Sequence, residues 1–263
     1  MGRREIVTMP DRGVVLEIVV EGDRPSVVLL PSARRGATDF AHLAGALSEA
    51  GFDSVAVNMR GVGGSRGSVA GITLREVADD IAGIITHIGA APMHVVGHAL
   101  GNVFARATAA YRPEVVRSVS LLACGGHEPA HVAPVEDILE HFERCGDAAL
   151  PDVQRRESLQ VVFFAPGNDP SPWLEGWWPG ADVRGIFDAT DPREWATAGT
   201  ASVLIVQPLQ DRLCARDVGQ NLLRRLGPRG RYVEVPDCGH AMLPEQPDVI
   251  ARELIAFLRE QGG

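Results

Sequence analysis

The chain has 263 residues and a formal net charge of −9, with 45% hydrophobic and 22% charged residues. This length suits one α/β domain with an insertion, and the composition is that of a globular protein with a sizeable core. The acidic balance argues against nucleic acid or an anionic membrane surface as a partner, because both attract basic patches. We expect the arginine pairs at 34–35, 155–156 and 224–225 to lie on the solvated surface.

We expect no membrane span and no secretory signal, since no segment is apolar for long enough and the first residues are polar. The cysteines lack the spacing of a zinc site, which predicts free thiols in a reducing cytoplasm. We therefore expect a cytoplasmic monomer or homodimer that acts on an apolar small molecule without a metal or another cofactor. The four cysteines are Cys124, Cys145, Cys214 and Cys238.

Short apolar runs and amphipathic stretches alternate along most of the chain. The apolar runs predict strands at 6–9, 14–20, 27–30, 54–59, 93–96, 115–123, 203–206 and 232–235. Helical spacing predicts helices at 40–50, 73–88, 102–110 and 215–226 and from 247 onward, with a capping box at Thr73 and Glu76. Such alternation implies an α/β protein with a mostly parallel sheet, whose ligands bind beyond the carboxyl ends of the strands.

One junction between a strand and a helix stands out. Gly97-His98-Ala99-Leu100-Gly101 has the layout of a nucleophile elbow, G-x-S-x-G, in which a sharp turn presents the central side chain to the active site. Here the central residue is Ala99, and its methyl group cannot act as a nucleophile.

Three further segments belong with the elbow. Asn58–Ser65 is a glycine-rich loop after a strand, Gln207–Arg212 places Asp211 after another strand, and Pro236–His240 ends on a histidine. With these segments in this order, the chain resembles the α/β-hydrolase fold family over nearly its whole length. The loop resembles the family's D-x-R-G-x-G-x-S motif, with Asn58 in place of the aspartate.

The resemblance implies an α/β-hydrolase core at 1–126 and 196–263 and a helical cap at 127–195. It assigns His240 as the general base, Asp211 as the acid that orients it, and Ala99 to the nucleophile position. The insertion holds all four tryptophans of the chain. Trp173 and Trp177 are expected to form an apolar roof over the substrate, and His98 to lie beside it.

The oxyanion hole also departs from the family pattern. Where the family commonly has His-Gly after its third strand, this chain has Pro31-Ser32-Ala33. Pro31 has no amide hydrogen, but Leu100 and either Ser32 or Ala33 still supply two backbone donors.

The alanine leaves several interpretations open. Ala99 is either natural or an introduced replacement of serine. If it is natural, Ser32 is a substitute nucleophile or only bonds backbone in its turn. Without any nucleophile, the pair of His240 and Asp211 still deprotonates a bound water or a carbon acid, as in a lyase or cofactor-free oxygenase. The leading expectation is hydrolase-type chemistry on a small apolar ester, thioester, lactone or related carbonyl compound, and the alternative is a ligand-binding protein without activity.

Overall fold

The computed structural model describes residues 2–124, 136–181, 186 and 190–262. Its eight strands form one sheet in the order β1-β2-β4-β3-β5-β6-β7-β8. The pairs β1–β2 and β2–β4 are antiparallel, and all the other pairs are parallel. The strands are β1 (Arg3–Met9), β2 (Val14–Glu21), β3 (Val27–Leu30), β4 (Ser54–Val57), β5 (Met93–His98), β6 (Val116–Leu122), β7 (Ser202–Pro208) and β8 (Gly230–Val235).

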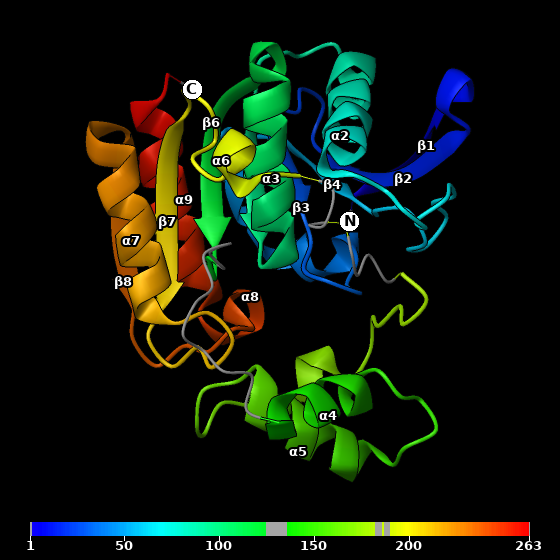
Figure 1. Ribbon diagram of the computed structural model, residues 1–263, viewed down its shortest axis with the longest axis vertical. Helices are drawn as coiled ribbons and strands as arrows, with labels where there is room; N and C mark the ends of the chain where they lie inside the picture. Colours follow the sequence, from blue (N-terminus) through cyan, green and yellow to red (C-terminus); the bar gives the residue numbers. More distant parts are fainter. Residues whose placement is uncertain (1, 125–135, 182–185, 187–189, 263) are drawn as a thin grey trace.

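Helices cover both faces of this sheet (Figure 1). On one face α2, α3 and α7 pack against the sheet, and on the other face α1, α8 and α9 do so. The helices are α1 (Ala41–Glu49), α2 (Leu74–Ile88), α3 (Leu100–Tyr111), α4 (Glu136–Cys145), α5 (Asp152–Val162), α6 (Pro192–Trp195), α7 (Arg216–Leu226), α8 (Met242–Glu245) and α9 (Pro247–Glu260). None of the helices in the described ranges is long and apolar enough to cross a lipid bilayer.

Neighbouring residues of the central strands bury their side chains in opposite cores. Val95 joins the core beneath α2 and α3, whereas Val96 joins the core beneath α1 and α9. Because successive side chains of a strand point to opposite faces, a strand buried on both sides is mostly apolar. This explains the wholly apolar run that predicted β3 and the run that predicted β5, in which His94 is the one polar residue.

The observed elements confirm the predicted α/β-hydrolase fold, with small shifts at their ends. The capping box is present, since Glu76 N donates to Thr73 Oγ1 and Thr73 N donates to the Glu76 carboxylate. β4 ends at Val57 rather than residue 59, because the Asn58 side chain turns inward to bond Ala37 N and Glu17 at 2.7 Å each. Asn58 therefore braces the glycine-rich loop against β2.

The segment between β6 and β7 forms a third apolar cluster of its own. α4 and α5 lie beyond the end of the sheet to which β6 and β7 point (Figure 1). Phe163, Phe164 and Trp173 form the centre of this cluster, and Ala241 from the loop before α8 also belongs to it. The predicted boundary at 126–127 lies outside the described residues.

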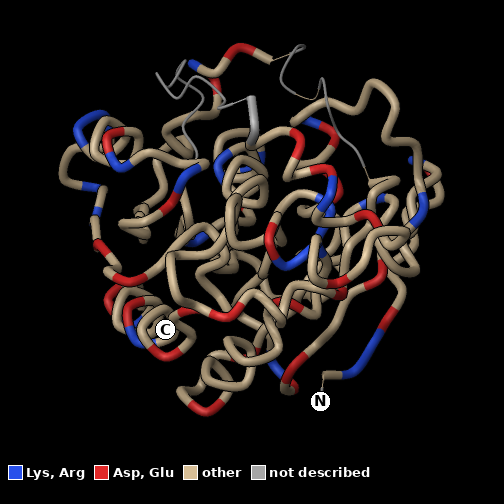
Figure 2. Tube along the Cα trace, turned by 90° about the horizontal axis from the view of Figure 1, so that it is seen from below, with Lys and Arg blue, Asp and Glu red and all other residues tan. Residues whose placement is uncertain are grey.

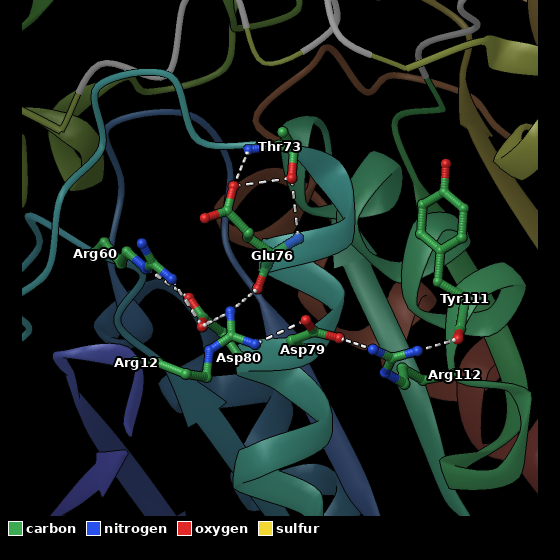
Figure 3. Close-up of polar contacts among 8 residues, drawn as sticks. All are labelled: Arg12, Arg60, Thr73, Glu76, Asp79, Asp80, Tyr111 and Arg112. Atoms are coloured by element: carbon green, nitrogen blue, oxygen red, sulfur yellow. Dashed lines mark hydrogen bonds and ion pairs between the residues drawn. The ribbon is translucent and has the colours of Figure 1, made fainter. Parts of the chain in front are cut away.

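A chain of ion pairs fixes α2 to the loops around it (Figure 3). Arg60 donates to both carboxylate oxygens of Asp80 at 2.6 and 2.9 Å, and the Asp80 side chain is fully buried. Arg12 bridges Asp80 and Asp79, and Arg112 pairs with Asp79. The loop after β4, the turn before β2 and the end of α3 are thereby joined to one helix.

Replacement of Asp80 is expected to destabilise the fold strongly. The Asp80→Asn variant leaves the Arg60 guanidinium buried without its counter-charge, and such a loss costs about 3–5 kcal/mol of unfolding free energy. Urea denaturation measures the difference from the wild-type protein. Glu194→Gln breaks the exposed pair with Arg75 and serves as the control, with an expected cost below about 1 kcal/mol. Equal costs for the two variants would contradict the interpretation.

Candidate active site

The elbow is built by a very close approach of β5 and α3. A Cβ on Gly97 would lie 2.1 Å from the carbonyl oxygen of Gly101, and a Cβ on Gly101 would lie 2.2 Å from that of Leu30. Only glycine fits at either position. Between them, Ala99 has φ 51° and ψ −111°, a backbone conformation that costs a non-glycine residue about 1–3 kcal/mol. The local geometry is thus that of a strained strand-to-helix turn with a methyl group at its apex.

Asp211 and His240 are brought together as the resemblance implied. His240 Nδ1 lies 2.9 Å from Asp211 Oδ2, and the Asp211 side chain is fully buried. The other oxygen, Asp211 Oδ1, accepts the backbone N–H groups of Leu213 and Cys214 at 2.8 and 2.9 Å. A carboxylate held this way keeps the proton on His240 Nδ1 and leaves Nε2 able to accept one. This arrangement suits a general base, a role that stays a prediction.

The same residues come near to forming a metal site, because ligand atoms of Asp211, Cys214 and His240 all lie within 4.8 Å of one another. Their chemistry does not fit a metal. Both oxygens of Asp211 are already engaged by protein donors. Burial and the neighbouring Asp211 raise the pKa of the Cys214 thiol well above its usual range, so it stays protonated, whereas metals bind the thiolate.

His98 supports the site from beneath rather than facing a substrate. Its ring is fully buried, and Nε2 lies 2.8 Å from the carbonyl oxygen of His240. Burial lowers the pKa of His98 to about 3, so the ring is neutral and Nε2 donates its proton to that carbonyl. His98 Nδ1 is buried and has no hydrogen-bond partner among the described residues. The predicted contact of His98 with a substrate remains untested, and its visible role is to fix the loop of His240.

Ser32 and Ala33 follow β3, the strand that neighbours β5 in the sheet. Both residues and Leu100 line one small pocket of about 30 Å³. The carbonyl of Ser32 accepts Arg35 N at 3.1 Å and so closes a tight turn. In the described part of the chain no hydrogen bond joins Ser32 Oγ to His240. Its role as a substitute nucleophile stays a prediction.

The expectation that residues 34–35 and 155–156 are solvated is wrong for three of the arginines. Arg35 is 2% exposed, Arg155 is 8% exposed, and the side chain of Arg34 is 9% exposed. Arg35 bonds Asp39 with two nitrogens at 2.6 and 2.9 Å, and its guanidinium lies over the rings of Trp173 and Trp177 at 4.6 and 4.9 Å. Such a stacked cation satisfies its charge and packs its planar face, which a sequence pattern of two adjacent arginines does not reveal.

The two tryptophans therefore have structural contacts that their predicted role as a roof did not include. Trp173 is 2% exposed and packs edge-to-face on the His98 ring with 6.0 Å between centroids. Trp177 is half-buried and donates its Nε1–H to the Trp173 carbonyl. Both fasten the segment between β6 and β7 to the loop after β3, while their contact with a substrate is untested.

Sequence reasoning missed Glu245, which holds the loop of His240 from the other side. Glu245 Oε1 accepts Gly239 N at 3.0 Å, and Oε2 accepts Ala165 N at 2.8 Å and Asn168 Nδ2 at 2.7 Å. Burial raises the pKa of this carboxyl, although the three hydrogen bonds favour its charged form. A lone glutamate five residues after His240 gives no signal in the sequence, because two of its three partners lie about 80 positions upstream.

Comparison with known proteins supports the fold assignment. The model of the alpha/beta hydrolase family matches residues 27–253, which is most of the chain. The chain belongs to the alpha/beta hydrolase family.

Relatives within the family have different names. A protein from Pantoea ananatis named "Putative carbamate hydrolase RutD" is 32% identical over 258 residues, covering 89% of this chain and 88% of its own. A protein from Mycobacterium tuberculosis named "Putative non-heme bromoperoxidase BpoC" is 24% identical over 245 residues, covering 89% and 93%. The solved structure of a thermophilic esterase from Thermogutta terrifontis matches with a TM-score of 0.79 at 19% identity, over 99% of this chain and 100% of the esterase. This last likeness shows that the fold is shared.

The buried His98 predicts a loss of stability in mild acid. The folded protein does not protonate this ring until about pH 3, whereas the unfolded chain does so near pH 6.5. The stability that neutral His98 contributes is thus present above pH 6.5 and is lost as the pH falls through this window. We expect His98→Gln to make the fall in unfolding free energy shallower, by up to about 1.4 kcal/mol per pH unit.

Urea denaturation at several values between pH 4 and pH 7 measures this slope. The exposed His87 gives a matched control, and His87→Gln should leave the slope close to that of the wild type. A His98→Gln variant with an unaltered slope would contradict the assignment.

Proposed function

We propose that this member of the family hydrolyses a small carbonyl compound by direct attack of water, without a covalent intermediate on the enzyme. The observation that carries the proposal is the pairing of His240 with Asp211 at 2.9 Å in a chain whose elbow presents only the methyl group of Ala99. We propose carbamates as the first substrate class, because the relative from Pantoea ananatis has that activity in its name. Small apolar esters, thioesters and lactones follow, since they present the same electrophilic carbon.

The reaction needs only groups that the chain supplies. His240 Nε2 takes a proton from a water molecule lying above the Ala99 methyl, and the hydroxide oxygen bonds to the substrate carbonyl carbon. The N–H of Leu100 has no acceptor within α3, whose first residue it is, and with the N–H of Ser32 or Ala33 it stabilises the oxyanion. His240 then gives the proton to the leaving oxygen or nitrogen as its bond to carbon breaks. A carbamate ester yields an alcohol and a carbamic acid.

We further propose that residues 127–195 act as a cap over the substrate, with the core at 1–126 and 196–263. The cluster around Trp173 supports this assignment, because it includes Ala241 beside the proposed base. A cover of aromatic rings limits the entry of bulk water and strengthens the electrostatic interactions beneath it.

A second candidate is a ligand-binding protein without catalytic activity. The observation in its favour is Ala99 itself, because loss of a nucleophile removes the covalent route that splits a hard step into two easier ones. A third route, in which Ser32 attacks, is an alternative within the hydrolase reading. The experiments below separate these three.

Loss of the base is expected to abolish turnover. His240→Gln should lower kcat/KM for aryl carbamates or p-nitrophenyl esters by about 10²–10⁴-fold, because it removes general base catalysis. Release of the phenol, followed by absorbance, measures the effect. The control His42→Gln removes a half-exposed ring at the surface and should leave kcat/KM unchanged, and so should Ser32→Ala. Turnover that vanishes in Ser32→Ala would instead identify Ser32 as the nucleophile, and saturable binding without turnover would favour the binding protein.

The Ala99→Ser variant tests whether the elbow can present a reactive serine to His240. We expect the wild-type protein to resist a fluorophosphonate probe and Ala99→Ser to be labelled at residue 99, because the serine hydroxyl would be presented where a triad needs it. Mass spectrometry of the labelled peptide is the measurement. The double variant Ala99→Ser with His240→Gln is the matched control and should not react. Labelling of the wild type at Ser32 would contradict direct water attack.

A further inference from the structure

A pocket at the end of the sheet away from the candidate active site is lined by three arginines. It lies where β3, β5 and β6 begin, whereas the candidate active site lies where the strands end. Its volume of about 470 Å³ falls in the range of small-molecule sites. Arg24 from the loop before β3, Arg117 from β6 and Arg259 from α9 line it, and we call it the basal pocket.

The three arginines lack the carboxylate partners that many other arginines of this chain have. Arg216 and Arg231, for example, each pair with a glutamate at 2.6 Å. Within the described ranges no carboxylate pairs with Arg24, Arg117 or Arg259, and the side-chain bond of Arg117 goes to the carbonyl of Gly262 at 3.3 Å. No aspartate or glutamate is among the residues that line the basal pocket. Three positive charges thus face one space in a chain whose net charge is −9.

Three arginines around one pocket differ from the distribution of charge in the rest of the chain. Figure 2 shows acidic and basic residues interspersed along the trace, which is the pattern expected where opposite charges offset each other locally. The ends of α1 and α9 also face the basal pocket, and the carbonyls at a helix C-terminus carry partial negative charge. The positive potential therefore depends on the arginine side chains and is not supplied by the backbone.

Apolar residues form part of the wall of the basal pocket. Phe52 is 5% exposed and meets the His94 ring edge-to-face with 6.3 Å between centroids, and Pro92 completes this wall. His94 Nδ1 bonds Ser118 Oγ at 2.8 Å. Burial and the nearby Arg117 lower the pKa of His94 to about 4, so the ring is neutral and adds no charge at pH 7. The lining of the basal pocket thus combines three arginines with several apolar residues.

We propose that the basal pocket binds a small organic phosphate through Arg24, Arg117 and Arg259, with the organic part lying against Phe52 and Pro92. Guanidinium groups offer paired N–H donors that match the oxygens of a phosphate, and their charge does not vary with pH in the physiological range. Three monovalent cations match a dianion or trianion better than a single carboxylate. The apolar wall gives a reason for an organic ligand rather than inorganic phosphate alone.

The test is a titration of the full-length protein with phenyl phosphate at low ionic strength, followed by calorimetry. We expect saturable binding that weakens at least tenfold in the double variant Arg24→Ala with Arg259→Ala, and that weakens in the presence of added salt. The control Arg252→Ala removes an exposed arginine of α9 outside the basal pocket and should change Kd less than twofold. The substituted arginines are exposed, so circular dichroism should show an unchanged unfolding midpoint.

Two companion ligands sharpen the assignment. Inorganic phosphate should bind more weakly than phenyl phosphate, and benzoate more weakly than both. Absence of binding by phenyl phosphate, or equal binding by the double variant and the wild type, would overturn the proposal. Benzoate binding as tightly as phenyl phosphate would overturn the choice of phosphate. None of these measurements involves turnover, so the result is independent of the proposed hydrolysis.

Discussion

The architecture of the candidate site depends on how closely β5 and α3 approach each other. Gly97 and Gly101 have no side chains, and this lets the helix begin directly over the strand and its neighbour β3. The chain between them must turn so sharply that Ala99 takes a positive φ. A residue at such a turn projects from the backbone instead of packing into the core, which is why the apex faces the carboxyl edge of the sheet. A methyl group instead of a hydroxyl at this apex leaves the constraint unchanged.

The position of His240 is fixed by parts of the chain that are far apart. The buried ring of His98 holds its carbonyl, Asp211 holds its Nδ1, and Glu245 holds the preceding Gly239. Ala241 N bonds the carbonyl of Phe163, which belongs to the aromatic cluster of the insertion. Because each contact restrains a different atom, the imidazole has little freedom to reorient. Such preorganisation is what the proposed role of His240 as a general base requires.

The two ends of the parallel strands differ in the groups that lie there. His240, Asp211 and the backbone amides after β3 and β5 lie at the C-terminal ends. Arginines without carboxylate partners in the described ranges lie at the N-terminal ends. The central strands β3, β4 and β5, which lie between the two ends, are buried along their whole length.

The sequence by itself determined the order of strands and helices, the elbow and the candidate pair of Asp211 and His240. These features depend on local patterns in the sequence. The patterns are short, mostly apolar runs for buried strands, apolar residues at helical spacing, helix-capping residues and glycines at a fixed spacing. Family resemblance then linked segments that are distant in the chain. The match over residues 27–253 confirms this reading of the fold, while the roles of the site residues and the boundaries of the cap remain proposals.

The tertiary structure alone decided which charged side chains are buried. Arg35 looked like a surface residue because its stacking partners, Trp173 and Trp177, lie about 140 positions away. Glu245, the His98 bond to His240 and the three arginines of the basal pocket were hidden for the same reason. Hydrophobic periodicity reports the environment of apolar side chains, whereas a polar side chain is buried only if distant partners satisfy it, and those partners are known only once the chain has folded.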